Sequence, residues 1–286
     1  MKPIHALSMR ADLHIHTTAS DGCWSPRQLI DELTRREIGL FAVTDHDSVD
    51  NVVDTAVLAQ KAGLHFLTGV EISATHKGGS FHILGYGIDP ACEALRRLLI
   101  HNQTLMEEAD HESIRKLIAD GLPVDFAEYH AYRHDPARGG WKSLNFLIDK
   151  GLCSDVKDFF ARWFTPERGI SFPEFPSLQA VGDAITAAGG VPVLAHPGSE
   201  FHGCSLEETL QEFAGGVIEG VECYHPGHDA ATTRQALAWC LQHNLIVTGG
   251  SDCHGDFVSG RQLGFPAIEG RQLLLGRLWD RVDTCL

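Results

Sequence analysis

Hydrophobic and polar residues alternate one by one near the start of the chain. Leu13 and Ile15 are apolar, whereas Asp12, His14 and His16 are polar. This period of two is typical of a β-strand, in which successive side chains point to opposite faces. His14 and His16 therefore point to the same face, where two neutral imidazoles can bind one cation. The pattern predicts a strand that presents two metal ligands together.

A Ser-Asp-Gly turn follows this strand at residues 20–22. The turn can bring the carboxylate of Asp21 back over the end of the strand, close to His14 and His16. Two imidazoles and a carboxylate are ligands that transition metals accept. A His-x-His pair alone is weak evidence, so the prediction of a metal site depends on further ligands elsewhere in the chain.

Apolar runs of strand length and amphipathic segments of helical length alternate over most of the chain. After the first strand, further strands are predicted at about residues 38–44, 64–72, 81–88, 191–195, 220–224 and 245–250. Helices are predicted at about residues 25–37, 51–62, 178–188, 206–213 and 232–243. Seven strands with intervening helices indicate a parallel sheet or barrel.

This alternation is interrupted in the middle of the chain. Residues 95–117 and 157–163 have helical patterns, and no strand of the earlier kind is predicted between them. We therefore predict a helical insertion at residues 100–170, which would act as a lid or substrate domain. The barrel would then be built from residues 1–99 and 171–286.

Residues that can bind metals recur at the predicted strand ends. In barrels of this kind, reactive groups gather at the carboxyl ends of the strands. The residues at or just beyond those ends are His14, His16, His46, Glu71, His196, His225, Asp252 and His254. Each one alone is an ordinary polar turn residue, but their repetition on nearly every strand favours one shared metal site. His82 is a weaker candidate because it lies at the start of its strand.

Composition narrows the class of function. A hydrophobic content of 43% and a charged content of 21% are typical of a globular protein. The net charge of -15 argues against a surface for long nucleic acid, which needs clustered Lys and Arg. It is compatible with a small anionic substrate, because bound cations reverse the field locally.

Eight cysteines without a C-x-x-C pair indicate reduced thiols. With no signal peptide and no apolar run of about 20 residues, a cytoplasmic protein without a membrane span is expected.

Six short motifs resemble those of the PHP superfamily, named after polymerase and histidinol phosphatase. They are His14-x-His16, Thr44-Asp45-His46-Asp47, Gly69-Val70-Glu71-Ile72, Phe81-His82-Ile83-Leu84-Gly85-Tyr86, Ala195-His196-Pro197 and Gly250-Ser251-Asp252-Cys253-His254. The segment 221–226 is similar to the subgroup of nucleotide and bisphosphate phosphatases and the related oligoribonucleotide exonuclease. The resemblance covers residues 11–89 and 178–264 and implies an α/β fold, a distorted (β/α)7 barrel with an inserted small helical domain.

The resemblance also implies two or three divalent metal ions, which in this family are manganese, iron or zinc. Carried over position by position, the ligands form three groups: His14, His16, Glu71 and Asp252 for the first metal; Glu71, His82 and His196 for the second; Asp21, His46 and His254 for the third. His82 is thereby included, although its place at the start of a strand made it a weak candidate.

The chain departs from the phosphatase pattern in the insertion, which bears on the predicted substrate contacts. Nucleotide phosphatases of this subgroup carry an Arg-x-His-like motif there, whereas no histidine follows Arg138 by two or three residues. Arg138 and Lys142 would share one face if this segment is helical, either as phosphate ligands or as a solvated surface. His225 and His228 follow a strand end and are candidates for phosphate contact or for protonation of the leaving group.

These features predict a metal-dependent phosphoesterase that uses a metal-bridging hydroxide to hydrolyse a small phosphorylated metabolite. A nucleotide, a bisphosphate, a sugar phosphate and a cyclic phosphate all fit this class. One alternative is a 5′-3′ exonuclease on short RNA, and another is a non-catalytic regulatory module stabilised by metal. An amidohydrolase also begins with His-x-His, but it would resemble a family with a carboxylated lysine on a middle strand, and no predicted strand end carries a lysine.

Overall fold

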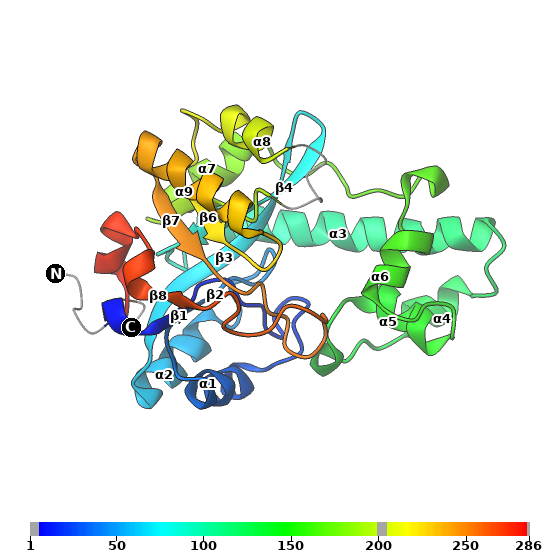
Figure 1. Cartoon of the computed structure of the whole chain (residues 1–286). Coiled ribbons are helices and arrows are strands. Elements are labelled where there is room, and N and C mark those ends of the chain that lie inside the picture. The colour runs from blue at the N-terminus through cyan, green and yellow to red at the C-terminus, as the bar shows by residue number, and fades with distance from the viewer. Residues whose placement is uncertain (1–5, 199–204, 285–286) are drawn as a thin grey trace.

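A mixed sheet forms the centre of the protein, as the computed structural model shows for residues 6–198 and 205–284 (Figure 1). Its strands are β1 (Arg10–Asp12), β2 (Ile38–Val43), β3 (His65–His76), β4 (Gly79–Tyr86), β5 (Val191–Leu194), β6 (Gly220–Tyr224), β7 (Ile246–Gly249) and β8 (Ile268–Glu269). Within the described residues they are ordered β7-β6-β5-β4-β3-β2-β1-β8. The backbone N–H of Leu13, just after β1, donates to the carbonyl of Gly249 in β7 at 3.1 Å. The sheet therefore nearly closes into a barrel, and the predicted barrel-like α/β fold is confirmed.

The prediction of a wholly parallel sheet is wrong at β4. This strand pairs antiparallel with both β3 and β5, whereas β1–β2, β2–β3, β5–β6 and β6–β7 are parallel. The cause is the two-residue connection Lys77-Gly78, where both residues have positive φ angles of 49° and 80°. Such a short turn makes a hairpin, since a parallel connection needs a much longer crossover. The start of β4 therefore lies at the edge where the parallel strands end.

The strand predicted to carry His14 and His16 is shorter than its sequence pattern indicates. Regular pairing ends at Asp12, and the next residues are held by separate hydrogen bonds on both sides. On one side the backbone N–H of Thr44 donates to the carbonyl of Ile15 at 2.8 Å, and on the other the N–H of His16 donates to the carbonyl of Cys253 at 2.8 Å. The segment still lies between β2 and the end of β7, where both histidines are buried.

The helices that pack on the barrel begin and end close to their predicted limits. They are α1 (Pro26–Arg35), α2 (Val52–Ala62), α7 (Leu178–Ala187), α8 (Leu206–Glu212) and α9 (Ala230–His243). Local chemistry explains these limits. Ser25 caps α1 and forms a capping box with Gln28, and Gly63 ends α2 in the left-handed conformation with φ of 70°. Such signals are read directly from the sequence. None of the helices in the described ranges combines the length and hydropathy of a membrane span.

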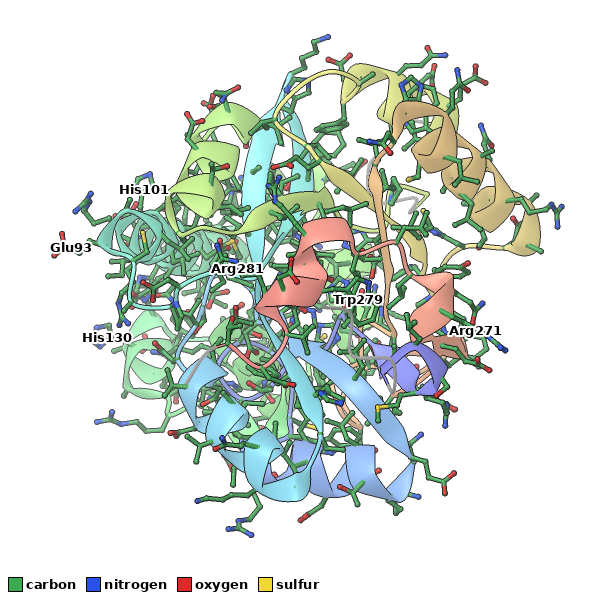
Figure 2. All side chains as sticks on the ribbon, turned by 90° about the vertical axis from the view of Figure 1, so that its left-hand side faces the viewer. Glu93, His101, His130, Arg271, Trp279 and Arg281 are labelled. Carbon is green, nitrogen blue, oxygen red and sulfur yellow. The ribbon has the colours of Figure 1, made fainter. Side chains whose placement is uncertain are left out.

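The C-terminal segment closes the barrel at the end where the parallel strands begin. It forms a 3₁₀ turn, η7 (Gly276–Arg281), which Figure 2 shows lying across this end with Trp279 and Arg281 labelled. Leu278 and Trp279 are buried and belong to the cluster of apolar side chains inside the barrel. The backbone N–H of Asp283 donates to the carbonyl of Phe66 at 2.8 Å, which ties the segment to the start of β3. The opposite end of the barrel is left for other residues.

The middle of the chain forms helices that extend from the barrel (Figure 1). They are α3 (Glu93–Ala119), α4 (Phe126–Ala131), α5 (Lys142–Asp149) and α6 (Val156–Asp158), which continues into a π turn, η3 (Phe159–Trp163). These helices enclose a hydrophobic cluster of their own, which includes Ile114, Tyr129, Phe146 and Trp163. The sequence pattern predicted α3 and the α6–η3 segment and missed α4 and α5. The division into barrel and insertion stays a prediction, and α3 runs across its limit at residue 100.

Candidate metal centre

All nine predicted ligands lie together at the barrel end where the parallel strands finish. Their nitrogen and oxygen atoms form three groups in which all atoms are within 4.8 Å of one another: His14, His16, Glu71 and Asp252; His16, Asp21, His46 and His254; and His46, Glu71 and His82. The groups overlap, since His16, His46 and Glu71 each belong to two of them. His196 lies beside the third group, with its Nε2 at 3.0 Å from Glu71 Oε1. The cluster indicates a site for more than one metal ion.

Glu71 lies at the centre of this cluster because β3 continues past the barrel edge into the hairpin. Its carboxylate is fully buried and is surrounded by the ring nitrogens of five histidines. Three contact Oε2 and two contact Oε1: His14 at 3.1 Å, His16 at 3.2 Å, His46 at 3.2 Å, His82 at 3.1 Å and His196 at 3.0 Å. Two carboxylate oxygens offer about four lone pairs, fewer than five donated hydrogens would need. Converging nitrogen lone pairs and a buried carboxylate are instead a donor set that suits divalent transition metals.

Burial favours the neutral form that binds metals in three of these imidazoles, His46, His196 and His254, by lowering the pKa of each. It lowers the pKa of His196 to about 3, and it holds the pKa of His46 well below its ordinary value. His14 differs: burial again lowers its pKa, but the Glu222 and Glu71 carboxylates outweigh that effect and raise the pKa to about 10. In the metal-free protein His14 is thus charged, and metal binding must displace a proton from it.

The proton positions around His14 are determined by Glu222 on β6, which is fully buried. His14 Nδ1 donates to Glu222 Oε1 at 2.9 Å, so its Nε2 is the nitrogen that faces Glu71 and Asp252. Glu222 Oε2 accepts the backbone N–H of His196 at 2.8 Å, although His196 has a positive φ of 28°. A carboxylate behind a metal-binding histidine orients the ring and fixes its tautomer. Sequence reasoning did not propose Glu222, and the available signal was a charged residue inside an apolar strand.

The carboxylate of Asp252 divides its two oxygens between different neighbours. Oδ1 lies 3.1 Å from His16 Nε2, on the metal side, and Oδ2 lies 3.2 Å from His225 Nε2. The backbone N–H of Gly227 donates to Nδ1 of His225 at 3.0 Å. Burial lowers the pKa of His225 to about 4, so its single proton must lie on Nε2 and be donated to Asp252. His225 was predicted to contact substrate, and in the structure it faces the centre as a hydrogen-bond donor.

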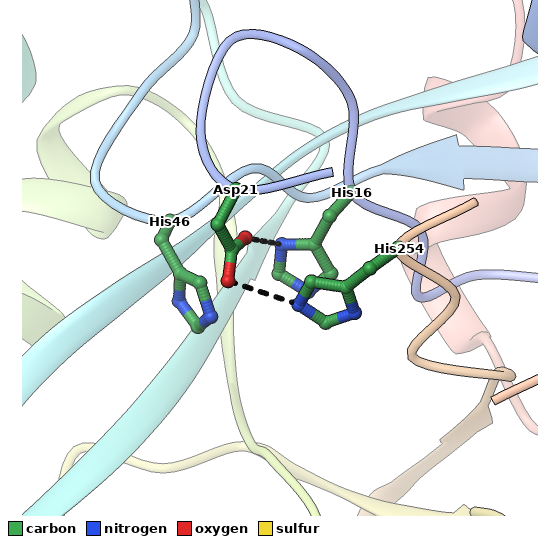
Figure 3. Close-up of side chains that lie close together, drawn as sticks. All are labelled: His16, Asp21, His46 and His254. Carbon is green, nitrogen blue, oxygen red and sulfur yellow. Dashed lines mark ion pairs between the residues drawn. The ribbon is translucent and has the colours of Figure 1, made fainter. Parts of the chain in front are cut away.

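Asp21 supplies the carboxylate of the outer group, as Figure 3 shows. Its Oδ2 lies 3.3 Å from His254 Nε2, and its Oδ1 lies 3.7 Å from His16 Nδ1. Burial raises the pKa of Asp21, but the neighbouring His254 and His46 outweigh it and lower the pKa well below its ordinary value. The other ring nitrogen of His254 donates to the carbonyl of Asp252 at 2.8 Å, which leaves Nε2 directed at Asp21. The turn predicted from the Ser-Asp-Gly sequence therefore does return Asp21 to the histidines.

His82 occupies the same edge because β4 runs antiparallel to its neighbours. It pairs with Ser73 in the hairpin, two residues along β3 from Glu71, and its Nδ1 lies 3.1 Å from Glu71 Oε1. His82 was predicted to be a weak candidate because every strand was expected to run in the same direction, which would place the start of β4 away from the ligands. The family resemblance had already placed it among the ligands.

The segment from Arg138 to Lys142 is not one helix, so the condition for a shared helix face is not met. Gly139 and Gly140 lie between them with φ angles of 72° and 71°, so the chain turns before α5 begins at Lys142. Both cations have partners inside the insertion. Arg138 donates to both oxygens of Asp149 at 2.7 and 2.8 Å, and Lys142 donates to the carbonyl of His130 at 3.1 Å. Their use as phosphate ligands stays a prediction, and no contact with the metal centre is observed among the described residues.

His228 has backbone partners at both ring nitrogens. Its Nδ1 donates to the carbonyl of Cys223, and its Nε2 accepts the backbone N–H of Gly198, both at 3.0 Å. The ring therefore connects the loops that follow β5 and β6. This arrangement fits a role in holding His196 and His225 in place better than the predicted role in proton transfer.

An arginine that sequence reasoning missed lies in the centre. Arg261, in the loop between β7 and β8, has Nη1 in contact with Oδ2 of Asp252. Its side chain is 36% exposed, so part of it still faces solvent. The only sequence signal was its position a few residues after His254, in a loop whose path cannot be read from local pattern.

The insertion contacts this end of the barrel through a short glycine segment. The backbone N–H of Gly140 donates to the carbonyl of Asp21 at 2.8 Å. A Cβ at Gly139 would lie 2.6 Å from the side chain of Phe257, and one at Gly140 would lie 2.7 Å from it, so this ring lies directly against both glycines. Phe257 follows His254 in the loop that also carries Arg261. The insertion, the Asp21 turn and this loop are therefore packed together.

Comparison with known proteins agrees with this geometry. The family model described as "PHP domain" matches residues 12–132. A 3′,5′-nucleoside bisphosphate phosphatase of Chromobacterium violaceum is 30% identical over 256 residues, which cover 88% of this chain and 90% of the relative. The 5′-3′ exoribonuclease Rnm of Escherichia coli is 28% identical, with 94% of each chain covered. A solved structure from Chromobacterium violaceum, described as an amidohydrolase with bound SO4 and no metal, has a TM-score of 0.76 at 27% identity and covers 95% of this chain and 96% of its own. The chain therefore belongs to the PHP domain family and is a metal-dependent phosphoesterase.

Proposed function

We propose that the protein removes a phosphate from a small nucleotide, with a nucleoside 3′,5′-bisphosphate as the first candidate substrate. The observation that carries the proposal is the overlap of three ligand groups through Glu71, His16 and His46. Overlapping groups favour metal ions close enough to act on one phosphoryl group. The choice of substrate is supported by the bisphosphate phosphatase relative, which matches most of the chain.

In this proposal the nine predicted ligands hold two or three divalent ions. The first ion would be bound by the group around His14 and Asp252, the second by Glu71 with His82 and His196, and the third by the group around Asp21 and His254. Bound in this way, the ions supply Lewis acidity that promotes ionisation of water and stabilises charge on the transferring phosphoryl group. The chemistry of the donor set does not distinguish manganese, iron and zinc.

The remaining residues of the centre orient these ligands and their protons. Glu222 holds the His14 proton on Nδ1 and keeps Nε2 directed at the centre. His225 holds its own proton on Nε2, beside Asp252, where it can also be donated to a substrate oxygen. The near-complete burial of His14, His16 and Glu71 excludes bulk water from the inner part of the cluster, which strengthens electrostatic interactions there.

A 5′-3′ exonuclease on short RNA is the second candidate. The exoribonuclease relative matches 94% of this chain, slightly more than the 88% that the phosphatase matches, at 28% rather than 30% identity. Against it, the net charge is -15, and Arg138 is already paired with Asp149 in the insertion. Since affinity for a nucleic-acid backbone depends on Lys and Arg contacts, the acidic balance favours a substrate of one nucleotide.

Phosphate release after manganese loading tests the proposal. The panel contains AMP, a nucleoside 3′,5′-bisphosphate, a ribose cyclic phosphate, a sugar phosphate and a short 5′-phosphorylated RNA. We expect the bisphosphate to have the highest kcat/KM and Glu71→Gln to be inactive with reduced metal content. Preference for the RNA would support the exonuclease, and silence across the panel with metal bound would contradict both proposals.

A further inference from the structure

Two hydrogen-bond donors meet at the oxygen of Asp252 that faces away from the predicted ligands. Oδ1 faces the metal side, with His16 Nε2 at 3.1 Å, whereas Oδ2 is contacted by His225 Nε2 at 3.2 Å and by Arg261. Oδ2 can accept two hydrogen bonds, so His225 and Arg261 each occupy one of its lone pairs.

Arg261 is distinguished by its charge. Among the residues that the structure describes, it is the one Arg or Lys paired with a carboxylate of the metal centre. A guanidinium carries five donors in a planar fork that matches the oxygens of a phosphate. One nitrogen contacts Asp252, and part of the side chain still faces solvent. The guanidinium of Arg261 therefore lies beside the metal centre, where it could contact an oxygen of a bound phosphoryl group.

The loop around Arg261 is fixed on both sides. Before it, the backbone N–H of Asp256 donates to Sγ of Cys23 at 3.2 Å, next to the Asp21 turn. After it, the backbone N–H of Gly264 donates to Oδ2 of the buried Asp12 at 2.8 Å. These anchors at both ends hold the backbone of the loop against the Asp21 turn and the start of the barrel.

The charges of the centre favour an exchange of partners. Without metal, Asp252 and Arg261 neutralise each other. Two or three bound cations would attract the Asp252 carboxylate and repel the guanidinium, and a phosphoryl dianion would then replace Asp252 as the arginine's partner. Arg–phosphate hydrogen bonds are charge-assisted and often bidentate, so this exchange keeps the guanidinium paired.

We propose that Arg261 binds the phosphoryl group of the substrate, with His225 as the second donor beside it. The inference rests on the proposed function only in requiring a phosphate ester at the metal centre, and it holds for either substrate candidate. It adds Arg261 of the barrel loop to the predicted candidates for phosphate contact, which were Arg138, Lys142, His225 and His228, and it retains His225 from that set.

The test compares Arg261→Gln and Arg261→Lys with Arg271→Gln, a matched loss of charge on the outer surface (Figure 2). Metal content is measured by mass spectrometry, and the Kd of inorganic phosphate for the manganese-loaded protein is measured by calorimetry. We expect Arg261→Gln to retain its metals and to bind phosphate roughly 10- to 100-fold more weakly, because a charge-assisted contact is lost. Arg261→Lys should lose less, and Arg271→Gln should match the wild type.

Two results would overturn the proposal. One is unchanged phosphate affinity in Arg261→Gln, and the other is a loss of metal that accounts for the whole loss of phosphate binding, which would make Arg261 a positioning residue for Asp252. A wrong choice of substrate gives a result different from these two. A wild type that binds phosphate through Arg261 without hydrolysing the bisphosphate would refute the substrate and support the inference.

Discussion

Replacing Glu222 by glutamine tests how the metal centre is organised. The carboxylate accepts two hydrogen bonds, from His14 Nδ1 at 2.9 Å and from the backbone N–H of His196 at 2.8 Å. Glutamine keeps the shape but offers a single carbonyl oxygen, and its NH₂ group must face one of the two donors. If NH₂ faces His14, the ring must place its proton on Nε2 and is lost as a ligand. If NH₂ faces His196, a buried N–H is left unsatisfied in a segment that already has a positive φ.

Both orientations of the glutamine amide lower the free energy of unfolding. A hydrogen bond to a charged group contributes about 1.5–3 kcal/mol, and a buried donor without an acceptor costs about 1–3 kcal/mol. We therefore expect Glu222→Gln to lower the free energy of unfolding of the metal-free protein by about 2–3 kcal/mol. Removing a carboxylate behind a metal-binding histidine also weakens metal affinity by roughly 10- to 100-fold.

The assays are urea unfolding after EDTA treatment and competition for metal with a chelating dye. Glu219→Gln is the control, because Glu219 lies next to the same strand but is exposed and pairs only with Arg277 among the residues described. The control should change neither quantity by more than a few tenths of a kcal/mol. Metal affinity and stability equal to wild type in Glu222→Gln would refute the view that this carboxylate orients the ligands.

Three further predictions concern the ligands and the insertion. Asp21→Asn should lose one metal per chain by mass spectrometry and keep the far-ultraviolet circular dichroism of wild type, and unchanged metal content would exclude Asp21 as a ligand. Gly140→Ala should lower the free energy of unfolding more than Gly121→Ala does. Both glycines have a positive φ, which costs an alanine about 1–2 kcal/mol. Only the Cβ at position 140 would in addition lie 2.7 Å from Phe257. The hydrogen bonds of Arg138 and Tyr132 lower the pKa of Asp149 to about 2, so the stability that Asp149 contributes is complete above pH 3.8 and is lost as the pH falls towards 2. Asp149→Asn should thus cost less than about 1 kcal/mol at pH 7, and a difference that grew in acid would contradict this sign.

Local signals explain why so much of the fold was predictable. The helices begin and end at capping residues such as Ser25 and Gly63, which act on their own backbone neighbours. The strands follow from apolar runs, and most of the predicted ligands follow from their place directly after those runs. Within the insertion the same reasoning missed α4 and α5, which are short helices joined by loops and stabilised by a cluster formed from distant parts of the chain.

The substrate contacts could not be predicted in the same way. Arg138 and Lys142 are four residues apart, and only the positive φ angles of Gly139 and Gly140 show that no helix joins them. Glu222 and Arg261 are identified as site residues only by the tertiary structure. The nearly closed sheet brings Glu222 to His14, and the loop after β7 brings Arg261 to Asp252.

Most elements of the barrel and the residues able to bind metal could be predicted from the sequence alone, because strand period, helix caps and ligand chemistry are properties of short segments. The tertiary structure decided which of those residues meet, in which protonation state and beside which cation. A two-residue hairpin reverses β4 and brings His82 to the centre. The near closure of the sheet buries Glu71 among five imidazoles and places Glu222 behind His14. Two of these contacts join residues more than 100 positions apart, His196 with Glu71 and His14 with Glu222, and local sequence pattern does not show which distant segments will pack together.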